Sequence, residues 1–127
     1  MILGIGIDII EVTRVHASVE RFGERFLKRI LLADEIAYCQ SHKKTAPYIA
    51  ARFAAKEAIS KAFGTGIGAK LSWHDMEVKR RESGEPFVVL HGNGENLLQE
   101  RGGRGVLISL SHTDNYAAAV AVLESAS

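Results

Sequence analysis

The sequence predicts an α+β protein in which an antiparallel sheet packs against a long helix. Residues 2–12 are rich in β-branched side chains, which is typical of a strand. Residues 47–63 carry alanines at helical spacing, and the last third of the chain holds short apolar runs around polar turns. These strands and helices do not alternate regularly, so we do not expect a doubly wound parallel sheet.

The composition indicates one ordinary folded domain that spans residues 1–127. Hydrophobic residues make up 46% of the chain and charged residues 24%, which argues against disorder. The net charge of +1 gives no global attraction to nucleic acid. Cys39 is the single cysteine, so no internal disulfide forms and a cytoplasmic protein is expected. The first apolar run contains Asp8 and lacks an early positive charge, so neither a signal peptide nor a membrane span is expected there.

The N-terminal strand has two different faces, because successive side chains alternate. One face is expected to hold Leu3, Ile5, Ile7 and Ile9, and the other Gly4, Gly6 and Asp8. A carboxylate inside an apolar strand is costly unless it is paired or binds a cation. Asp8 is therefore either satisfied by backbone N–H groups or an arginine, or it is a functional group. The glycines beside it allow a ligand or another backbone to come close.

The next helix is predicted to run from Thr13, as its N-cap, to about Ile30. The residues expected to pack inward are Val15, Val19, Phe22 and Phe26. A basic stripe without an interposed acid covers about 60° of this helix if the helix is regular. Its members are Arg14, Arg21, Arg25 and Lys28. Such a stripe is either a solvated face or a docking surface for an acidic partner.

Caps, turns and apolar runs predict the remaining elements. Asp34 is expected to cap a short helix through His42. Pro47 is expected to open a third helix that ends near Phe63, before Gly64. The later elements are strands over 75–81 and 86–91, a short helix over 94–101, and strands over 105–111 and 116–123.

The third helix combines a face of small residues with a polar line. The small face holds Ala51, Ala55, Ala58 and Ala62, which permit close packing against a sheet. The polar line holds Phe53, Glu57, Ser60 and Gly64, with Lys56 and Lys61 on its flanks. We expect this line to face a cleft or solvent. Taken alone, Glu57 and Lys61 would suit an exposed i, i+4 salt bridge worth only a few tenths of a kcal/mol, roughly.

The other candidate motifs give little evidence of function by themselves. The glycine-rich segment 64–70 is no P-loop, because Ala69 stands where a Walker sequence has glycine and Leu71 where it has serine or threonine. His42 and His74 show no zinc-ligand spacing. Residues 112–113, a His-Thr pair after a strand, would alone be read as a turn.

Three segments nevertheless occur together and in order. They are GIGIDIIE at 4–11, RFAAKEAISKAFGTG at 52–66, and SLSHT at 109–113 followed by Tyr116-Ala117. Together they resemble the signatures of the holo-acyl-carrier-protein synthases, the short-chain branch of the phosphopantetheinyl transferase family. The resemblance covers nearly the whole chain, and the central segment is long and specific. It favours functional roles for Asp8 and Glu57.

The resemblance implies a transferase of fatty acid biosynthesis. Such an enzyme moves 4′-phosphopantetheine from coenzyme A to a serine of apo acyl carrier protein and releases adenosine 3′,5′-bisphosphate. Its catalytic residues would be Asp8, Glu57 and Lys61, with Mg²⁺ held by the two carboxylates and a phosphate facing the lysine. The implied nucleotide-binding residues are Arg52, Phe53, Ser60, Lys61, Gly64, Thr65, Pro86, His112 and Thr113. The basic stripe of Arg14, Arg21, Arg25 and Lys28 would bind the carrier.

The resemblance also implies the phosphopantetheinyl transferase fold assembled as a homotrimer, with nucleotide sites between subunits. Relatives with a doubled fold place a second metal carboxylate two residues after the first, but Ile10 stands there in this chain. The general base stays open between Glu57 and a metal-bound water. Two alternative functions are a catalytically silent nucleotide-binding or carrier-binding module and a trimeric structural protein whose charges serve only its interface.

Overall fold

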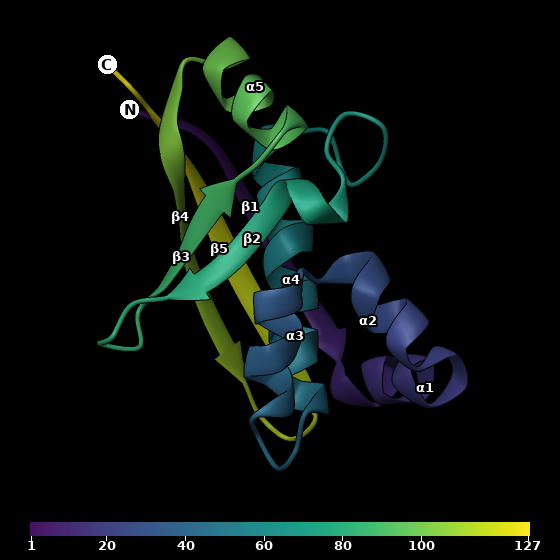
Figure 1. The fold of residues 1–127 in the computed structure, drawn as a ribbon. Helices are drawn as coiled ribbons and strands as arrows, with labels where there is room; N and C mark the ends of the chain where they lie inside the picture. Colours follow the sequence, from purple (N-terminus) through teal and green to yellow (C-terminus); the bar gives the residue numbers. More distant parts are fainter.

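A computed structural model describes the whole chain, Met1–Ser127, as strands and helices wrapped around one long helix (Figure 1). In chain order the elements are β1 (Ile2–Glu11), α1 (Val12–Phe22), α2 (Glu24–Ile30), α3 (Ala33–Gln40), α4 (Ala46–Phe63), a 3₁₀ turn (Trp73–Asp75), β2 (Met76–Arg80), β3 (Pro86–Leu90), α5 (Asn93–Glu100), β4 (Gly103–His112) and β5 (Tyr116–Ser125). No helix has both the length and the apolar character needed to cross a membrane.

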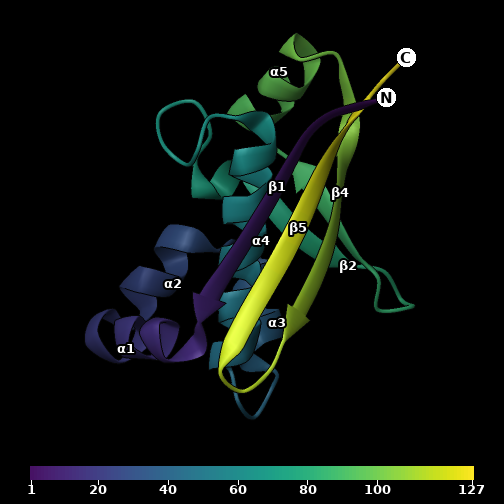
Figure 2. The same cartoon turned by 180° about the vertical axis from the view of Figure 1, so that it is seen from behind.

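The strands form two antiparallel units. β1, β5 and β4 make a three-stranded sheet in that order, and β2 pairs with β3 as a separate hairpin. The sheet covers one side of α4, while α3 and β2 lie on its other side (Figures 1 and 2). The predicted α+β class, an antiparallel sheet packed on a long helix, is thus confirmed.

The single helix predicted over 13–30 is wrong, because the chain breaks at Gly23 into α1 and α2. Gly23 has φ 57° and ψ −135°, a conformation that side chains disfavour and glycine adopts readily. Its N–H donates to the carbonyl of Val19 at 2.7 Å and closes the end of α1. Thr13 does not cap this helix, since α1 begins one residue earlier and its N-cap is Glu11.

The other predicted elements are present, with small changes at their ends. α3 starts at Ala33 and ends at Gln40, so Asp34 lies in its first turn and the N-cap is Leu32. α4 has a proline in its first turn and ends before Gly64, as predicted. The strands and the helix expected in the second half correspond to β2, β3, α5, β4 and β5.

β1 and α4 touch backbone to backbone. A Cβ atom on Gly4 would lie 1.9 Å from the carbonyl oxygen of Ala62, and one on Gly6 would lie 1.9 Å from that of Ala58. Neither position therefore has room for a side chain. Both alanines belong to the predicted small face of the helix, which is buried as expected. The glycines thus admit another backbone to β1.

The opposite face of β1 is apolar and exposed. Ile5, Ile7 and Ile9 keep 61%, 68% and 67% of their surface accessible, and Leu107 of β4 extends the same face. Leu3, which we expected beside these isoleucines, packs instead against the core. The cause is a register irregularity between Ile2 and Gly4, which turns Leu3 to the inner side. A large apolar sheet face therefore has no partner within the chain.

Lys56, expected on the flank of the polar line, is fully buried. Its ammonium donates to Glu35 Oε1 at 2.8 Å and to the carbonyls of Ile30 at 2.7 Å and Trp73 at 3.1 Å. The second Glu35 oxygen accepts the N–H of Val78 at 2.9 Å. Burial lowers the pKa of Lys56, and the Glu35 carboxylate opposes that shift. The pair satisfies its own hydrogen bonds and ties α3, α4 and β2 together.

Gly6→Ala should lower the free energy of unfolding by about 1–3 kcal/mol, because the new methyl group must push β1 away from α4. Urea unfolding followed by circular dichroism measures this change. Gly105→Ala is the matched control, since a Cβ at that strand position meets nothing within 4 Å. Equal stabilities for the two variants would contradict the close contact.

Candidate functional site

Asp8 lies on the face of β1 that packs against α4, two residues beyond Gly6. Its side chain is 16% exposed, and Lys61 Nζ donates to Asp8 Oδ1 at 3.1 Å. Lys61 belongs to the last turn of α4 and also donates to the carbonyl oxygen of Ile7 at 2.9 Å. The carboxylate in the apolar strand is therefore paired with a lysine that the structure brings from α4.

Glu57 lies one turn before Lys61 on the same helix, yet the two form no ion pair. Lys61 reaches Asp8 instead, so the i, i+4 salt bridge that the pair would suit if taken alone does not form. Burial raises the pKa of Glu57, the Asp8 carboxylate raises it further, and Lys61 opposes both effects. One lysine thus faces two carboxylates, and the contact between β1 and α4 carries excess negative charge.

This donor set suits a hard divalent cation. The chain has no cluster of three or more His, Cys, Asp or Glu side chains that could hold a metal, whereas a structural zinc site takes four such ligands. Mg²⁺ commonly uses one or two carboxylates and takes its other ligands from phosphates and waters. A pocket of about 300 Å³ opens beside the pair and is lined by Ile7, Asp8, Ile9, Lys61 and Ala118. The residues present therefore fit Mg²⁺ bound together with a phosphate.

Arg52 lies on the opposite flank of α4 from Lys61, because nine residues of helix correspond to two and a half turns. Its side chain is buried, and its guanidinium carbon lies 4.1 Å from the centroid of the Tyr38 ring. Its Nε and Nη1 atoms have no hydrogen-bond partner. Burial lowers the pKa of Arg52. Buried donors without acceptors are costly, and an anion would satisfy them.

His112 ends β4 near the start of α4. Its ring lies 4.8 Å from that of Tyr48, which in turn stacks on His42 at 3.6 Å. The hydroxyl of Thr113 accepts two backbone N–H groups of the β4–β5 turn, at 3.2 and 3.1 Å, and so shapes that turn. Pro86 begins β3, which runs beside β4 (Figure 1).

The predicted residues therefore form two groups on different sides of one chain. The β1 group consists of Asp8, Glu57 and Lys61. The β4 group consists of Arg52, Pro86, His112 and Thr113. β5 separates β1 from β4 in the sheet, and α4 lies between the groups on its inner face (Figure 2). A single chain does not bring the two groups together.

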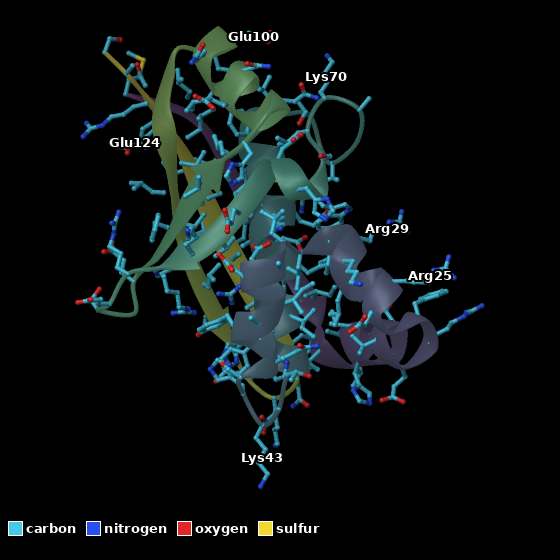
Figure 3. All side chains as sticks on the ribbon, viewed as in Figure 1. Arg25, Arg29, Lys43, Lys70, Glu100 and Glu124 are labelled. Atoms are coloured by element: carbon cyan, nitrogen blue, oxygen red, sulfur yellow. The ribbon has the colours of Figure 1, made fainter.

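The other residues predicted to bind the nucleotide differ in their surroundings: some are packed in the interior, and some line a pocket. Phe53 packs against Trp73, with ring centroids 5.0 Å apart. Ser60 is buried and its hydroxyl donates to the carbonyl of Glu57 at 2.7 Å, so it does not face a cleft as expected. Gly64 and Thr65 line a pocket of about 610 Å³ at the end of α4. Lys70, from the same lining, extends outward from the loop beside α5 (Figure 3).

The predicted basic stripe is divided between two helices. Arg14 and Arg21 belong to α1, whereas Arg25 and Lys28 belong to α2. Lys28 also has an acidic neighbour, because Glu24, which helical spacing places to one side of the stripe, lies 3.5 Å from its ammonium. The turn at Gly23 changes the helical phase, so the four side chains do not form one regular row.

The break creates an apolar groove with a basic rim. The groove measures about 330 Å³ and is lined by Ser18, Phe22, Arg25, Phe26 and Arg29. Phe22, expected inside, is 48% exposed, and the Arg21 guanidinium lies 5.2 Å from the centre of its ring. Arg25 and Arg29 extend outward on one side of α2 (Figure 3). Sequence reasoning missed Arg29, which a helix restarted at Gly23 would have placed one turn after Arg25.

The fold and the charged contact between β1 and α4 match a known class of transferase. A family model described as the 4′-phosphopantetheinyl transferase superfamily matches residues 4–121. The chain belongs to this superfamily. Among its relatives is a holo-[acyl-carrier-protein] synthase of Koribacter versatilis, 52% identical over 124 residues, which cover 98% of this chain and 99% of the relative.

Solved structures agree with this assignment. The holo-[acyl-carrier-protein] synthase of Neisseria meningitidis superposes with a TM-score of 0.91 at 35% identity, covering 98% of this chain and 99% of that one. The enzyme of Helicobacter pylori in complex with coenzyme A gives a TM-score of 0.85 at 34% identity, covering 94% and 99%. The similarity therefore spans the complete fold.

Glu57→Gln should stabilise the metal-free protein at neutral pH. The folded state raises the pKa of Glu57, so ionising this carboxyl opposes folding, and the loss of stability grows as the pH rises from the ordinary glutamate value through the raised one. A neutral glutamine removes that loss. Urea unfolding with a chelator present should show the difference at pH 7, and the difference should shrink below about pH 4. A less stable variant at pH 7 would contradict the charge imbalance.

Proposed function

We propose that this chain transfers 4′-phosphopantetheine from coenzyme A to a serine of an apo acyl carrier protein, as a step in fatty acid biosynthesis in the cytoplasm. The observation that carries the proposal is the meeting of Asp8, Glu57 and Lys61 between β1 and α4. Its relatives are holo-[acyl-carrier-protein] synthases, and one solved relative contains coenzyme A. Residues 1–127 would act as one transferase domain.

The chemistry assigns a role to each charged group. Asp8 and Glu57 would hold Mg²⁺, which when bound withdraws negative charge from the diphosphate of coenzyme A. Lys61 would turn from Asp8 to a phosphate oxygen, where its compact charge stabilises the developing negative charge. The serine oxygen forms a bond to the β-phosphorus, and the bond from that phosphorus to the bridging oxygen breaks. Adenosine 3′,5′-bisphosphate leaves with the electron pair.

The serine proton requires an acceptor near the same contact. Glu57 is one candidate, because burial raises its pKa toward the range useful for a base. A water held beside the two carboxylates is the other candidate. Either acceptor lies on the β1 side of α4, so proton removal and phosphate binding would occur within the β1 group.

We propose further that the nucleotide site forms between two chains of a homotrimer. Within one chain the β1 group and the β4 group lie on opposite flanks of α4, and each alone is incomplete. The unpartnered Nε and Nη1 atoms of Arg52 suit a phosphate of the nucleotide, with His112 nearby. The exposed isoleucines of β1 offer an apolar face of the kind that subunit interfaces cover. Contacts to the nucleotide would also come from Phe53, Ser60, Gly64, Thr65, Pro86 and Thr113.

The carrier would bind at the groove between α1 and α2. Acyl carrier proteins present acidic surfaces, and the groove combines exposed Phe22 with a basic rim. The cations proposed for docking are Arg14, Arg21, Arg25 and Lys28, to which the structure adds Arg29. The pairing of Lys28 with Glu24 makes Lys28 the weakest member of this set.

Asp8→Asn should reduce transfer by roughly a hundredfold or more, because it removes a carboxylate from the site while keeping the side chain's shape. The measurement is the mass gain of an apo carrier incubated with coenzyme A, Mg²⁺ and enzyme. Asp34→Asn, at an exposed carboxylate of α3, is the control and should transfer at the wild-type rate. A wild-type protein that binds coenzyme A but never modifies the carrier would instead support the catalytically silent module.

Light scattering should give three times the chain mass of 13.8 kDa. Ile5→Glu should shift the protein toward monomer, since it places a charge on the apolar sheet face. Phe22→Glu is the control, because Phe22 is also an exposed apolar residue but lies on α1. This variant should leave the mass of the assembly unchanged. Mixing inactive Lys61→Ala and His112→Ala chains should restore about a quarter of the sites if each site draws on two chains. No restored activity from a confirmed mixed trimer would contradict shared sites.

Reversing Arg21 and Arg25 to Glu should raise the KM for the carrier about tenfold at low salt and leave coenzyme A affinity unchanged. Wild-type turnover at low carrier concentration should fall as salt rises, and the reversed variant should lose that dependence. Arg104→Glu combined with Lys79→Glu, which reverses two exposed charges outside the groove, is the charge-matched control. If the reversed variant kept wild-type carrier kinetics, the groove would be a solvated surface only.

A further inference from the structure

Arg101 follows the last residue of α5 and reaches back to two other elements. Its Nη1 atom donates to the carbonyl oxygen of Phe63 at 2.6 Å, and its Nη2 atom donates to that of Leu3 at 3.3 Å. The side chain is partly buried. α5 lies at the end of the molecule where α4 finishes and β1 begins (Figure 2). One guanidinium therefore joins the end of the long helix to the start of the first strand.

Each accepting carbonyl lies at a place where regular pairing is interrupted. Phe63 ends α4, where the last carbonyls have no partner within the helix. The backbone amides after Phe63 do not donate to its carbonyl. Gly64 N–H donates to the carbonyl of Lys61, and the next two amides donate to that of Ser60. Leu3 lies at the register irregularity of β1. A cation also interacts favourably with the negative end of a helix.

Only two side chains hydrogen-bond across the contact between β1 and α4. One is Lys61, which donates to Asp8 and to the Ile7 carbonyl, and the other is Arg101, which joins Leu3 at the start of β1 to Phe63 at the end of α4. In the proposed function, on which this inference rests, Lys61 turns to a phosphate and gives up its bond to Asp8. Arg101 is then the side chain whose hydrogen bonds still join β1 to α4.

We infer that Arg101 is a positioning residue for the transfer reaction. Gly4 and Gly6 set how closely β1 approaches α4, and pairing with β5 holds the strand in its sheet. The irregularity between Ile2 and Gly4 leaves the offset between the start of β1 and the end of α4 to be secured by a side chain. The Arg101 bridge fixes that offset, and with it the separation of the Asp8 and Glu57 carboxylates. Because Phe63 precedes Gly64 and Thr65, the same bridge holds the segment that lines the large pocket beside α5.

The test compares Arg101→Met, which keeps the length of the side chain, with Arg101→Lys, which keeps the charge but bonds fewer carbonyls. Arg104→Met is the control, since Arg104 is exposed and makes no hydrogen bond or ion pair. Amide exchange at Thr65 and Gly66 is measured on ligand-free protein, and coenzyme A affinity by calorimetry. The Mg²⁺ concentration for half-maximal turnover is measured in the transfer assay.

Arg101→Met should speed exchange at both amides and should raise the half-maximal Mg²⁺ concentration and the coenzyme A Kd by roughly threefold to tenfold, while the carrier KM stays constant. Arg101→Lys should lie between wild type and Arg101→Met. Should Arg101→Met not fold, the comparison of Arg101→Lys with wild type carries the same expectation. Lower thermal stability with unchanged Mg²⁺ and coenzyme A dependence would overturn the inference and leave a structural role only. If wild type bound no coenzyme A, the proposed function would fail, while the exchange rates would still decide whether Arg101 holds the segment.

Discussion

Two glycines of β1 rest directly on the carbonyl groups of α4, and the positions of the charged groups follow from this contact. Gly4 and Gly6 leave no space for a Cβ atom against Ala62 and Ala58. Since side chains alternate along a strand, the next residue on the same face is Asp8. The carboxylate is thereby directed toward the helix at a depth that water reaches only partly. Lys61, one helical step before Ala62, is close enough to meet it. The same packing that excludes side chains from two positions thus creates the polar contact at the third.

Neighbouring charges on α4 have different surroundings, because the helix is covered on nearly every side. Lys56 points away from the sheet, where Glu35 and backbone carbonyls satisfy it completely. Glu57, the next residue, points toward β1, where Asp8 repels it. Arg52, one turn before Lys56 on the same side of the helix, is buried with donors that no group in the chain accepts. Buried charged groups whose hydrogen bonds are all satisfied gain little from a ligand. Buried groups with unsatisfied donors or repelling charges are stabilised when a ligand of opposite charge binds. The chain therefore concentrates its unsatisfied groups at the places where the nucleotide and metal are proposed to bind.

Sequence reasoning predicted what depends on local periodicity and failed where distant segments decide. The alternation of β1 and the alanine spacing of α4 were sufficient to place Asp8 and the small helix face correctly. The break at Gly23 was missed because helical spacing continues on both sides of a glycine, and only the positive φ reveals the turn. The burial of Lys56 was missed because its partner, Glu35, lies 21 residues earlier on another helix. Leu3 was misplaced because a strand irregularity leaves no signature in the order of apolar residues.

The separation of the β1 and β4 groups by α4 has a consequence for how such a protein is controlled. If each active site takes residues from two chains, the activity per chain is not fixed by the sequence alone. Mass action makes the activity per chain depend on abundance, since dilution below the dissociation constant of the assembly separates the chains that form each site. A cell that halves synthesis of such a protein near that threshold would lose more than half of its catalytic capacity. Because α4 keeps the two groups apart within one chain, the expression level of such a protein determines how many of its active sites are complete.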